Sequence, residues 1–206
     1  MRIDSVKKSE RKQGRFLVKL ESGDLLRVTE EELLRFGLRS GMELGEEELK
    51  ALRSSAAESS VKAQAAHMIG SRALSKQELH RRLVKKGAEA SDAQAAVEWL
   101  EDIGAVDDAG YAAALVRHYG GRGYGARRVK EELRRRGVPQ TLWDAALEEL
   151  PDSAQVLDAL IQKRCRGDLS DPRECKRTCD ALLRRGFSWG EVKSALSRYG
   201  EIEEDI

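Results

Sequence analysis

The sequence has little of what marks a membrane protein, a disulfide-stabilised protein or a β-sandwich. Aromatic residues make up 5% of its 206 residues and charged residues 35%, a composition that favours helices with solvated outer faces over a β-sandwich. Its three cysteines are an odd and sparse number. The sequence shows no secretory signal, and no run approaches the roughly 20 apolar residues of a membrane helix. We therefore expect a soluble, cytoplasmic protein of a reducing compartment, with no membrane partner.

Residues that could carry catalysis or bind a metal are also scarce. The histidines His67, His80 and His118 stand far apart and form no H-x-x-x-H or H-E-x-x-H motif. The cysteines lack the C-x-x-C spacing and the fourth ligand that a zinc site needs. The sequence therefore predicts a protein that is not an enzyme, with no catalytic residue, no metal site and no cofactor.

Charge is balanced over the whole chain but not along it. The formal net charge is +1, so the global charge gives no reason to expect a nucleic-acid partner. Residues 1–60 hold twelve charges of each sign, whereas eight Lys and Arg face two acids, Glu131 and Glu132, between Arg117 and Arg136. Any basic binding surface is therefore expected in that middle segment.

The first 53 residues have the pattern of a small α+β domain. FLVKL (16–20) and LLRV (25–28) flank a glycine-containing turn, which predicts a β-hairpin. Thr29 has Glu32 three residues on, the spacing of a helix-capping box. We call this predicted domain the head.

A segment rich in serine and alanine follows the head. Residues 43–53 look like another short helix, and SSAAESS (54–60) is either a joint or the start of a helix. We divide the chain there, and we treat EIEEDI (201–206) as an acidic tail. The predicted parts are the head 1–53, the joint 54–60, the helical repeats 61–108, 109–152 and 153–200, and the tail 201–206.

The helical part repeats with a period of about 50 residues. Gly87, Gly137 and Gly186 are 50 and 49 residues apart, and each follows a basic pair and has a leucine four residues before it. Apolar positions on both sides of each glycine recur with helical spacing, so each repeat reads as three helices with the glycine ending the middle one. Each repeat alone buries little, so we predict that the three stack into an elongated, curved array. The fold class is therefore mainly α, with three tandem three-helix repeats after an α+β head.

The stretch GGRGYGARRVKEELRRRGV (120–138) resembles a nucleotide-binding loop only superficially. Gly121 to Ala126 satisfies G-x-G-x-x-A, but a helical pattern rather than a strand precedes it. We interpret it as a tight turn between helices, shaped by Gly123, Tyr124 and Gly125, where Gly125 allows an unusual backbone angle.

The arginines after this turn allow two interpretations. They could form a solvated helix face paired with Glu131 and Glu132, or a surface that binds phosphate or acidic side chains. Two acids leave several arginines unpaired, which favours the binding surface. The basic pairs of all three repeats would then line one ridge.

Two blocks of the sequence together resemble the RecX family, whose members regulate the RecA recombinase. In RALSKQELHRRLVKKG the match is carried by positions such as Ser75, Leu83 and Gly87. In the block 103–138 it is carried by an acid pair, a Val-Arg pair and a Gly-Tyr-Gly turn. The resemblance covers about residues 61–200 and leaves out the head and the tail, and the third repeat matches mainly through its spacing.

The resemblance implies a negative regulator that binds in the groove of the RecA–DNA filament. Such a protein limits filament growth and lowers ATP hydrolysis, strand exchange and coprotease activity. The implied partners are the RecA filament and single- or double-stranded DNA, and we expect a monomer. The expected contacts with RecA or DNA are Arg117, Arg127, Arg128, Lys130, Arg134, Arg135, Arg136, Lys85, Lys86, Arg184 and Arg185. The expected structural positions are Asp107, Asp108, Tyr111, Gly123, Tyr124, Gly125, Gly87, Gly137 and Gly186.

Two further expectations follow from the same residues. Arg134, Arg135 and Arg136 look exposed, so their joint replacement by glutamate should abolish inhibition and leave the fold intact. The alternative function is a helical module that binds DNA or RNA directly, which would show steeply salt-dependent binding to nucleic acid alone.

Overall fold

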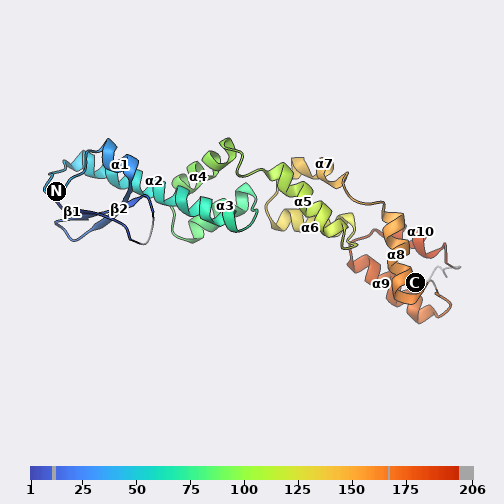
Figure 1. Cartoon of the computed structure of the whole chain (residues 1–206). Coiled ribbons are helices and arrows are strands. Elements are labelled where there is room, and N and C mark those ends of the chain that lie inside the picture. Colours follow the sequence, from blue (N-terminus) through green and yellow to red (C-terminus); the bar gives the residue numbers. More distant parts are fainter. Residues whose placement is uncertain (11–12, 167, 200–206) are drawn as a thin grey trace. The chain divides into compact units, whose positions relative to one another are not determined.

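The computed structural model describes residues 1–10, 13–166 and 168–199 (Figure 1). The chain divides into two compact bodies, Met1–Ala73 with Leu79–Val106, and Leu74–Glu78 with Asp107–Ile206. The division cuts through the helix that begins at Lys76, so the first residues of that helix pack with the second body.

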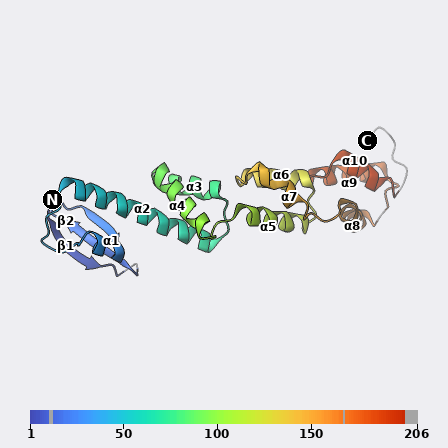
Figure 2. The same ribbon diagram turned by 90° about the horizontal axis from the view of Figure 1, so that it is seen from above.

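The head contains an antiparallel sheet of three strands. They are β1 (Ile3–Lys8), β2 (Arg15–Leu20) and β3 (Leu25–Thr29), in the order β1-β2-β3. Val18, Leu20 and Val28 are fully buried in the core that the sheet shares with α1 (Glu30–Arg35) and α2 (Glu46–Ser71). Because side chains alternate across a strand, the helices cover one face of the sheet and leave the other face open (Figure 2).

The predicted hairpin and the predicted capping box are both present in the head. Strands β2 and β3 pair as expected, and Thr29 and Glu32 exchange side chain-to-backbone hydrogen bonds at the start of α1. Strand β1 was not predicted, because its residues IDSVKK are mostly polar and give no clear apolar alternation. That strand is recognisable only from its partner, because Val6 and Lys8 lie opposite Val18 and Phe16.

The predicted joint at residues 54–60 is wrong. The 26-residue helix α2 runs through it without interruption. Ala56 is buried in the head core, Ser55 donates a hydrogen bond to Glu32, and the guanidinium of Arg15 donates to the hydroxyl and carbonyl oxygens of Ser59. The small side chains mark a helix face that lies close against the head, and not a flexible linker.

Three three-helix repeats follow, as the sequence predicts. The first uses α2, α3 (Lys76–Lys85) and α4 (Ala90–Asp102). The second uses α5 (Asp108–Gly120), α6 (Ala126–Arg135), the 3-10 turn η1 (Gln140–Leu142) and α7 (Trp143–Leu147), and the third uses α8 (Ser153–Cys165), α9 (Pro172–Arg184) and α10 (Trp189–Leu196). The second and third repeats each have their own apolar core. No helix in the described part of the chain is long and apolar enough to span a bilayer.

The three glycines that define the repeat end the middle helices as predicted. Gly87, Gly137 and Gly186 have φ of 93°, 71° and 92°, a left-handed conformation that only glycine adopts without strain. The elongated, curved shape that the repeat suggests stays a prediction.

Candidate partner-binding surface

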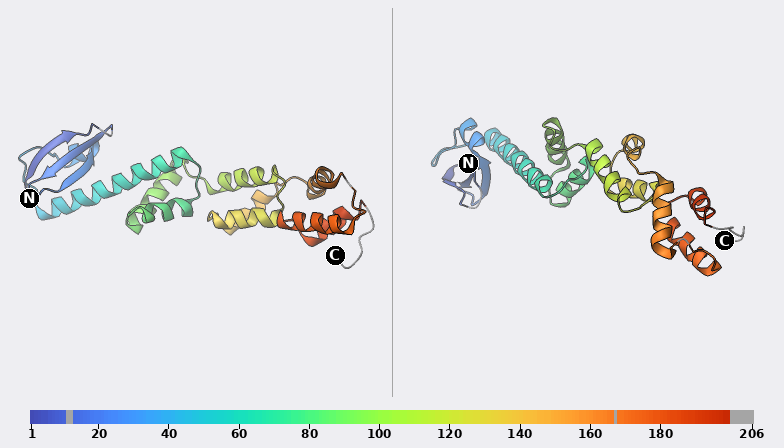
Figure 3. Two further views of the ribbon diagram at one scale, coloured as in Figure 1. Left: turned by 90° about the horizontal axis from the view of Figure 1, so that it is seen from below. Right: turned by 45° about the vertical axis from the view of Figure 1, so that its right-hand side comes forward.

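The middle helices of the second and third repeats meet end to end. Figure 3 shows α6 and α9 in line in its left view. The amides of Gly125 and Arg127, at the start of α6, donate hydrogen bonds to the carbonyls of Arg185 and Gly186, at the end of α9, at 2.9 and 3.1 Å. Free N–H groups of one helix thus satisfy free C=O groups of the next.

This junction requires glycine on both sides. A Cβ on Gly125 would lie 2.5 Å from the carbonyl oxygen of Gly186, and a Cβ on Gly186 would meet the backbone of Arg128. The sequence analysis assigned the unusual backbone angle to Gly125, and that prediction is wrong. Gly125 is extended with φ −80°, whereas Gly123 has φ 73°. Gly125 is needed for close backbone approach, and Gly123 for the turn.

Arg185 holds the same junction together with its side chain. Its guanidinium donates hydrogen bonds to the carbonyls of Arg122 and Gly123 at 2.9 and 3.1 Å. It also lies 5.4 Å from the ring centroid of Tyr124, a distance typical of a cation–π contact. Arg185 therefore serves packing between the repeats, and not the exposed ridge that the sequence analysis proposed for it.

An equivalent junction joins the start of α3 to the end of α6. The hydroxyl of Ser75 accepts the amide of Glu78 and donates to the carbonyl of Arg136. The buried Asp108 accepts the amide of Lys76 at 2.9 Å, while Asp107 caps its own helix through the amide of Ala109. The acid pair therefore caps two helices, α5 and α3.

Arg136 is a second arginine that was expected to be exposed but is half-buried in the structure. Its guanidinium donates a hydrogen bond to the hydroxyl of the buried Tyr111 at 2.8 Å, and its side chain is 31% exposed. Replacing residues 134–136 together with glutamate would therefore also break a contact inside the second repeat. The expectation that Arg136 is exposed is therefore wrong, because it is half-buried, and the expectation that the change leaves the fold intact stays a prediction.

Glu132 is a buried acid that neutralises neighbouring arginines. Its carboxylate lies 3.3 Å from Arg128 and 2.6 Å from Arg135. Burial alone would raise the pKa of Glu132, but the hydrogen bond and charge of Arg135 outweigh it, and the pKa is below its ordinary value of 4.5. The sequence allows a pairing of the α6 arginines with Glu131 and Glu132 as one of two interpretations. That pairing is present for Arg128, four residues before Glu132, and for Arg135, three residues after it.

Three cations remain on the outer side of α6. Arg127, Lys130 and Arg134 are exposed and share one helix face, since they are three and four residues apart. Arg127 donates to the carbonyl of Leu183 at 2.6 Å, and Arg134 lies 5.8 Å from the ring centroid of Trp143. Within the described residues none of the three has an ion-pair partner. We call these residues the α6 basic face.

The other predicted contacts lie elsewhere or are neutralised. Arg117 forms an ion pair with Glu149 at 2.5 Å. Arg184 is exposed at the end of α9, and Lys85 and Lys86 are exposed in the first body. The three cations of the α6 basic face therefore lie together on one helix, whereas a common ridge formed by the basic pairs of all three repeats stays a prediction.

Comparisons with known proteins converge on one family. Residues 107–147 match the family model described as "RecX, second three-helix domain", a segment that contains the α6 basic face. A protein named "Regulatory protein RecX" from Vibrio campbellii is 32% identical over 122 residues, which are 58% of this chain and 79% of the relative. The protein of the same name from Xanthomonas axonopodis pv. citri is 36% identical over 124 residues, 59% of this chain and 76% of the relative.

Solved structures support the fold. A crystal structure of a regulatory protein RecX matches 96% of this chain and 98% of its own, with a TM-score of 0.73 and 20% identity. The crystal structure of RecX from Lactobacillus salivarius matches 69% of this chain and 96% of its own, with a TM-score of 0.63 and 18% identity.

Proposed function

This chain belongs to the RecX family of regulatory proteins, and we propose that it regulates the RecA recombinase negatively by binding the RecA–DNA filament. In this proposal the protein lodges in the filament groove and limits filament growth. ATP hydrolysis, strand exchange and coprotease activity of the recombinase then fall together, because all three depend on the filament.

The α6 basic face is the observation that carries this proposal. Lys130 and Arg134 are exposed on the same side of one helix and are not neutralised by acids of the described chain. Cations of this kind can contact the acidic side chains or the phosphates of a filament. The neighbouring arginines Arg128 and Arg135 contribute less, because Glu132 compensates them.

The test is the ATPase activity of RecA on single-stranded DNA at increasing ratios of this protein. We expect the wild-type protein to inhibit, and the variant Lys130→Glu with Arg134→Glu to inhibit at least tenfold less, a difference of about 1.4 kcal/mol in binding. A matched control reverses two exposed charges of the third repeat, Lys163→Glu with Lys193→Glu. No inhibition by the wild-type protein at any ratio would overturn the proposal.

Direct binding of nucleic acid by the helical repeats is the second candidate, and the same α6 basic face supports it. It predicts tight, steeply salt-dependent binding to DNA or RNA without RecA, lost in the Lys130→Glu, Arg134→Glu variant. Inhibition that needs the assembled filament, with weak binding of this surface to free DNA, would favour the regulator.

A further inference from the structure

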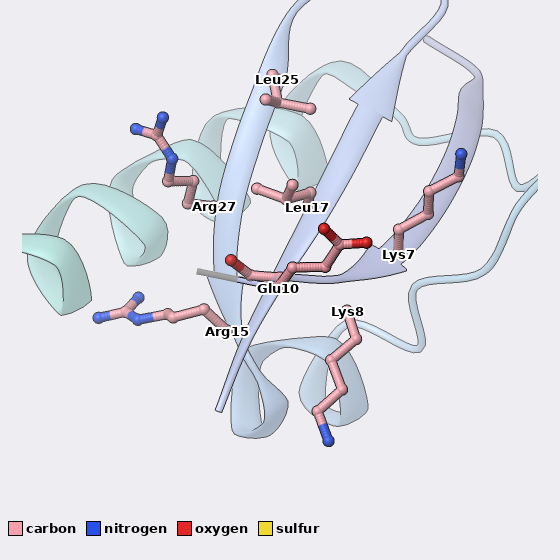
Figure 4. A pocket seen from close by; sticks show the side chains of 8 residues that line it. Lys7, Lys8, Glu10, Arg15, Leu17, Leu25 and Arg27 are labelled. Carbon is pink, nitrogen blue, oxygen red and sulfur yellow. The ribbon is translucent and has the colours of Figure 1, made fainter. Parts of the chain in front are cut away.

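The open face of the head sheet carries a hollow that the family resemblance does not explain. Its volume is about 590 Å³, and it extends over all three strands (Figure 4). Lys7, Leu17 and Arg27 are cross-strand neighbours in its centre, and Leu25 beside them is 51% exposed. The complete lining is Lys7, Lys8, Ser9, Glu10, Arg15, Leu17, Leu25 and Arg27.

Folding separates charges that are nearly balanced in the sequence of the head. Six of its acids lie in the first turns of the two helices, Glu30, Glu31 and Glu32 in α1 and Glu46, Glu47 and Glu48 in α2. Acids are favoured there by the helix dipole. The described lining of the hollow instead holds four cations and one acid, Glu10. Three of these cations, Lys7, Arg15 and Arg27, lie on the open face, which is therefore locally basic although residues 1–60 hold twelve charges of each sign.

Two of these cations are available to a ligand, and a third is held in place. Lys7 and Arg27 are exposed and have no ion-pair partner in the described chain. Arg15 is fixed by its hydrogen bonds to Ser59. Lys19, which lies on the same face, is neutralised by Asp4 at 2.8 Å. The unpaired positive charge is thus concentrated at the hollow.

The position of the hollow favours a nucleic-acid strand over an acidic peptide. Extended peptides bind sheets through the backbone groups of an edge strand, whereas this hollow lies over the face, where side chains are presented. Sheet faces bind single strands by combining cations for the phosphates with flat or apolar side chains for the bases. The eight described lining residues include two leucines and no aromatic residue, so they offer no aromatic surface for base stacking, and sequence preference should be low. The hollow has the size of a small-ligand pocket, too small to admit a duplex.

We propose that the open face of the head sheet binds single-stranded DNA through its phosphodiester backbone, with Lys7 and Arg27 as phosphate contacts and Leu17 and Leu25 as an apolar floor. This site is separate from the α6 basic face and needs no recombinase. It gives the protein a second attachment to any assembly that contains a single strand.

The test measures binding of the full-length protein to a fluorescent oligothymidylate, by anisotropy at several salt concentrations and without RecA. The plot of log K against log salt concentration has a negative slope, and each phosphate contact makes it steeper by about 0.7 for a single strand. In the variant Lys7→Gln with Arg27→Gln, we therefore expect the slope to be shallower by about 1.4. The variant Glu10→Gln should bind more tightly than the wild-type protein, because it removes the acid of the hollow. A duplex of the same length should bind less well than the single strand.

A matched control removes two exposed cations of the head outside the hollow, Arg39→Gln with Lys50→Gln, and should keep the wild-type slope. Three results would each overturn the proposal: no binding by the wild-type protein at low salt, equal loss in the control, or loss only in the Lys130→Glu, Arg134→Glu variant. That last result would place DNA binding on the helical repeats. The RecA ATPase assay tests the proposed function independently. A negative result for DNA binding by the head would therefore leave the proposed function unaffected.

Discussion

The helices α6 and α9 occupy equivalent places in successive repeats, yet they present different surfaces. Both end at a left-handed glycine, and both bury the leucine four residues before it, Leu133 or Leu182. The exposed Lys130 of α6 corresponds by position to Cys179 of α9, which is buried in the core of the third repeat. The comparison teaches that the repeat specifies the packing positions and leaves the intervening positions free to diverge.

Replacing Cys179 of α9 by lysine, the residue at the equivalent position of α6, should have the largest effect on stability. Cys179→Lys would place an ammonium group in a core where burial already raises the pKa of the thiol. An uncompensated buried charge costs about 3–5 kcal/mol, so we expect unfolding of the third repeat at much lower denaturant concentration. Trp189, at the start of α10, reports this by fluorescence. A loss below about 1 kcal/mol would mean that the position is not a core position, and the comparison would then fail.

The glycines that end the middle helices allow a second test, which separates the cost of the backbone conformation from the cost of a contact. Gly87 and Gly186 have nearly the same φ, but a Cβ at Gly87 meets nothing within 4 Å, whereas one at Gly186 meets the backbone of Arg128. Gly87→Ala should therefore cost about 1–2 kcal/mol for the left-handed conformation. Gly186→Ala should cost about 1–3 kcal/mol more because of the clash.

Chemical denaturation of the two variants, followed by circular dichroism, measures the difference. Equal losses in Gly87→Ala and Gly186→Ala would show that the end-to-end contact between α6 and α9 does not contribute to stability. The two substitutions match in chemistry and backbone angle, so the comparison isolates the contact.

The sequence predicted those features that depend on neighbours along the chain. The glycine spacing, the capping box at Thr29 and the leucines four residues before each glycine all act within one helix or turn. They identified the repeats and the ends of their middle helices correctly. The resemblance to the RecX family came from the same local patterns.

The features that the sequence did not predict depend on packing between segments far apart in the chain. Arg136 and Arg185 look like exposed members of basic pairs, but their partners, Tyr111 and Gly123, lie 25 and 62 residues away. The serines of 54–60 look like a linker until Arg15 and Glu32 are placed against them. The α6 basic face can likewise be identified only once the structure shows which arginines have packing roles.

The reverse exchange, Lys130→Cys, should have the smallest effect on stability. Lys130 is exposed and has no ion-pair or hydrogen-bond partner to lose within the described residues, and surface substitutions of this kind usually change stability by about 0.5 kcal/mol or less. Cysteine is a somewhat poorer helix former than lysine, by a few tenths of a kcal/mol, so the melting temperature should fall only slightly. The same substitution removes one charge of the α6 basic face, so inhibition of the RecA ATPase should weaken although the fold is retained. If Lys130→Cys destabilised the protein as much as Cys179→Lys, position 130 would be a packing position like its counterpart in α9, and the divergence between the two helices could not be the basis of binding.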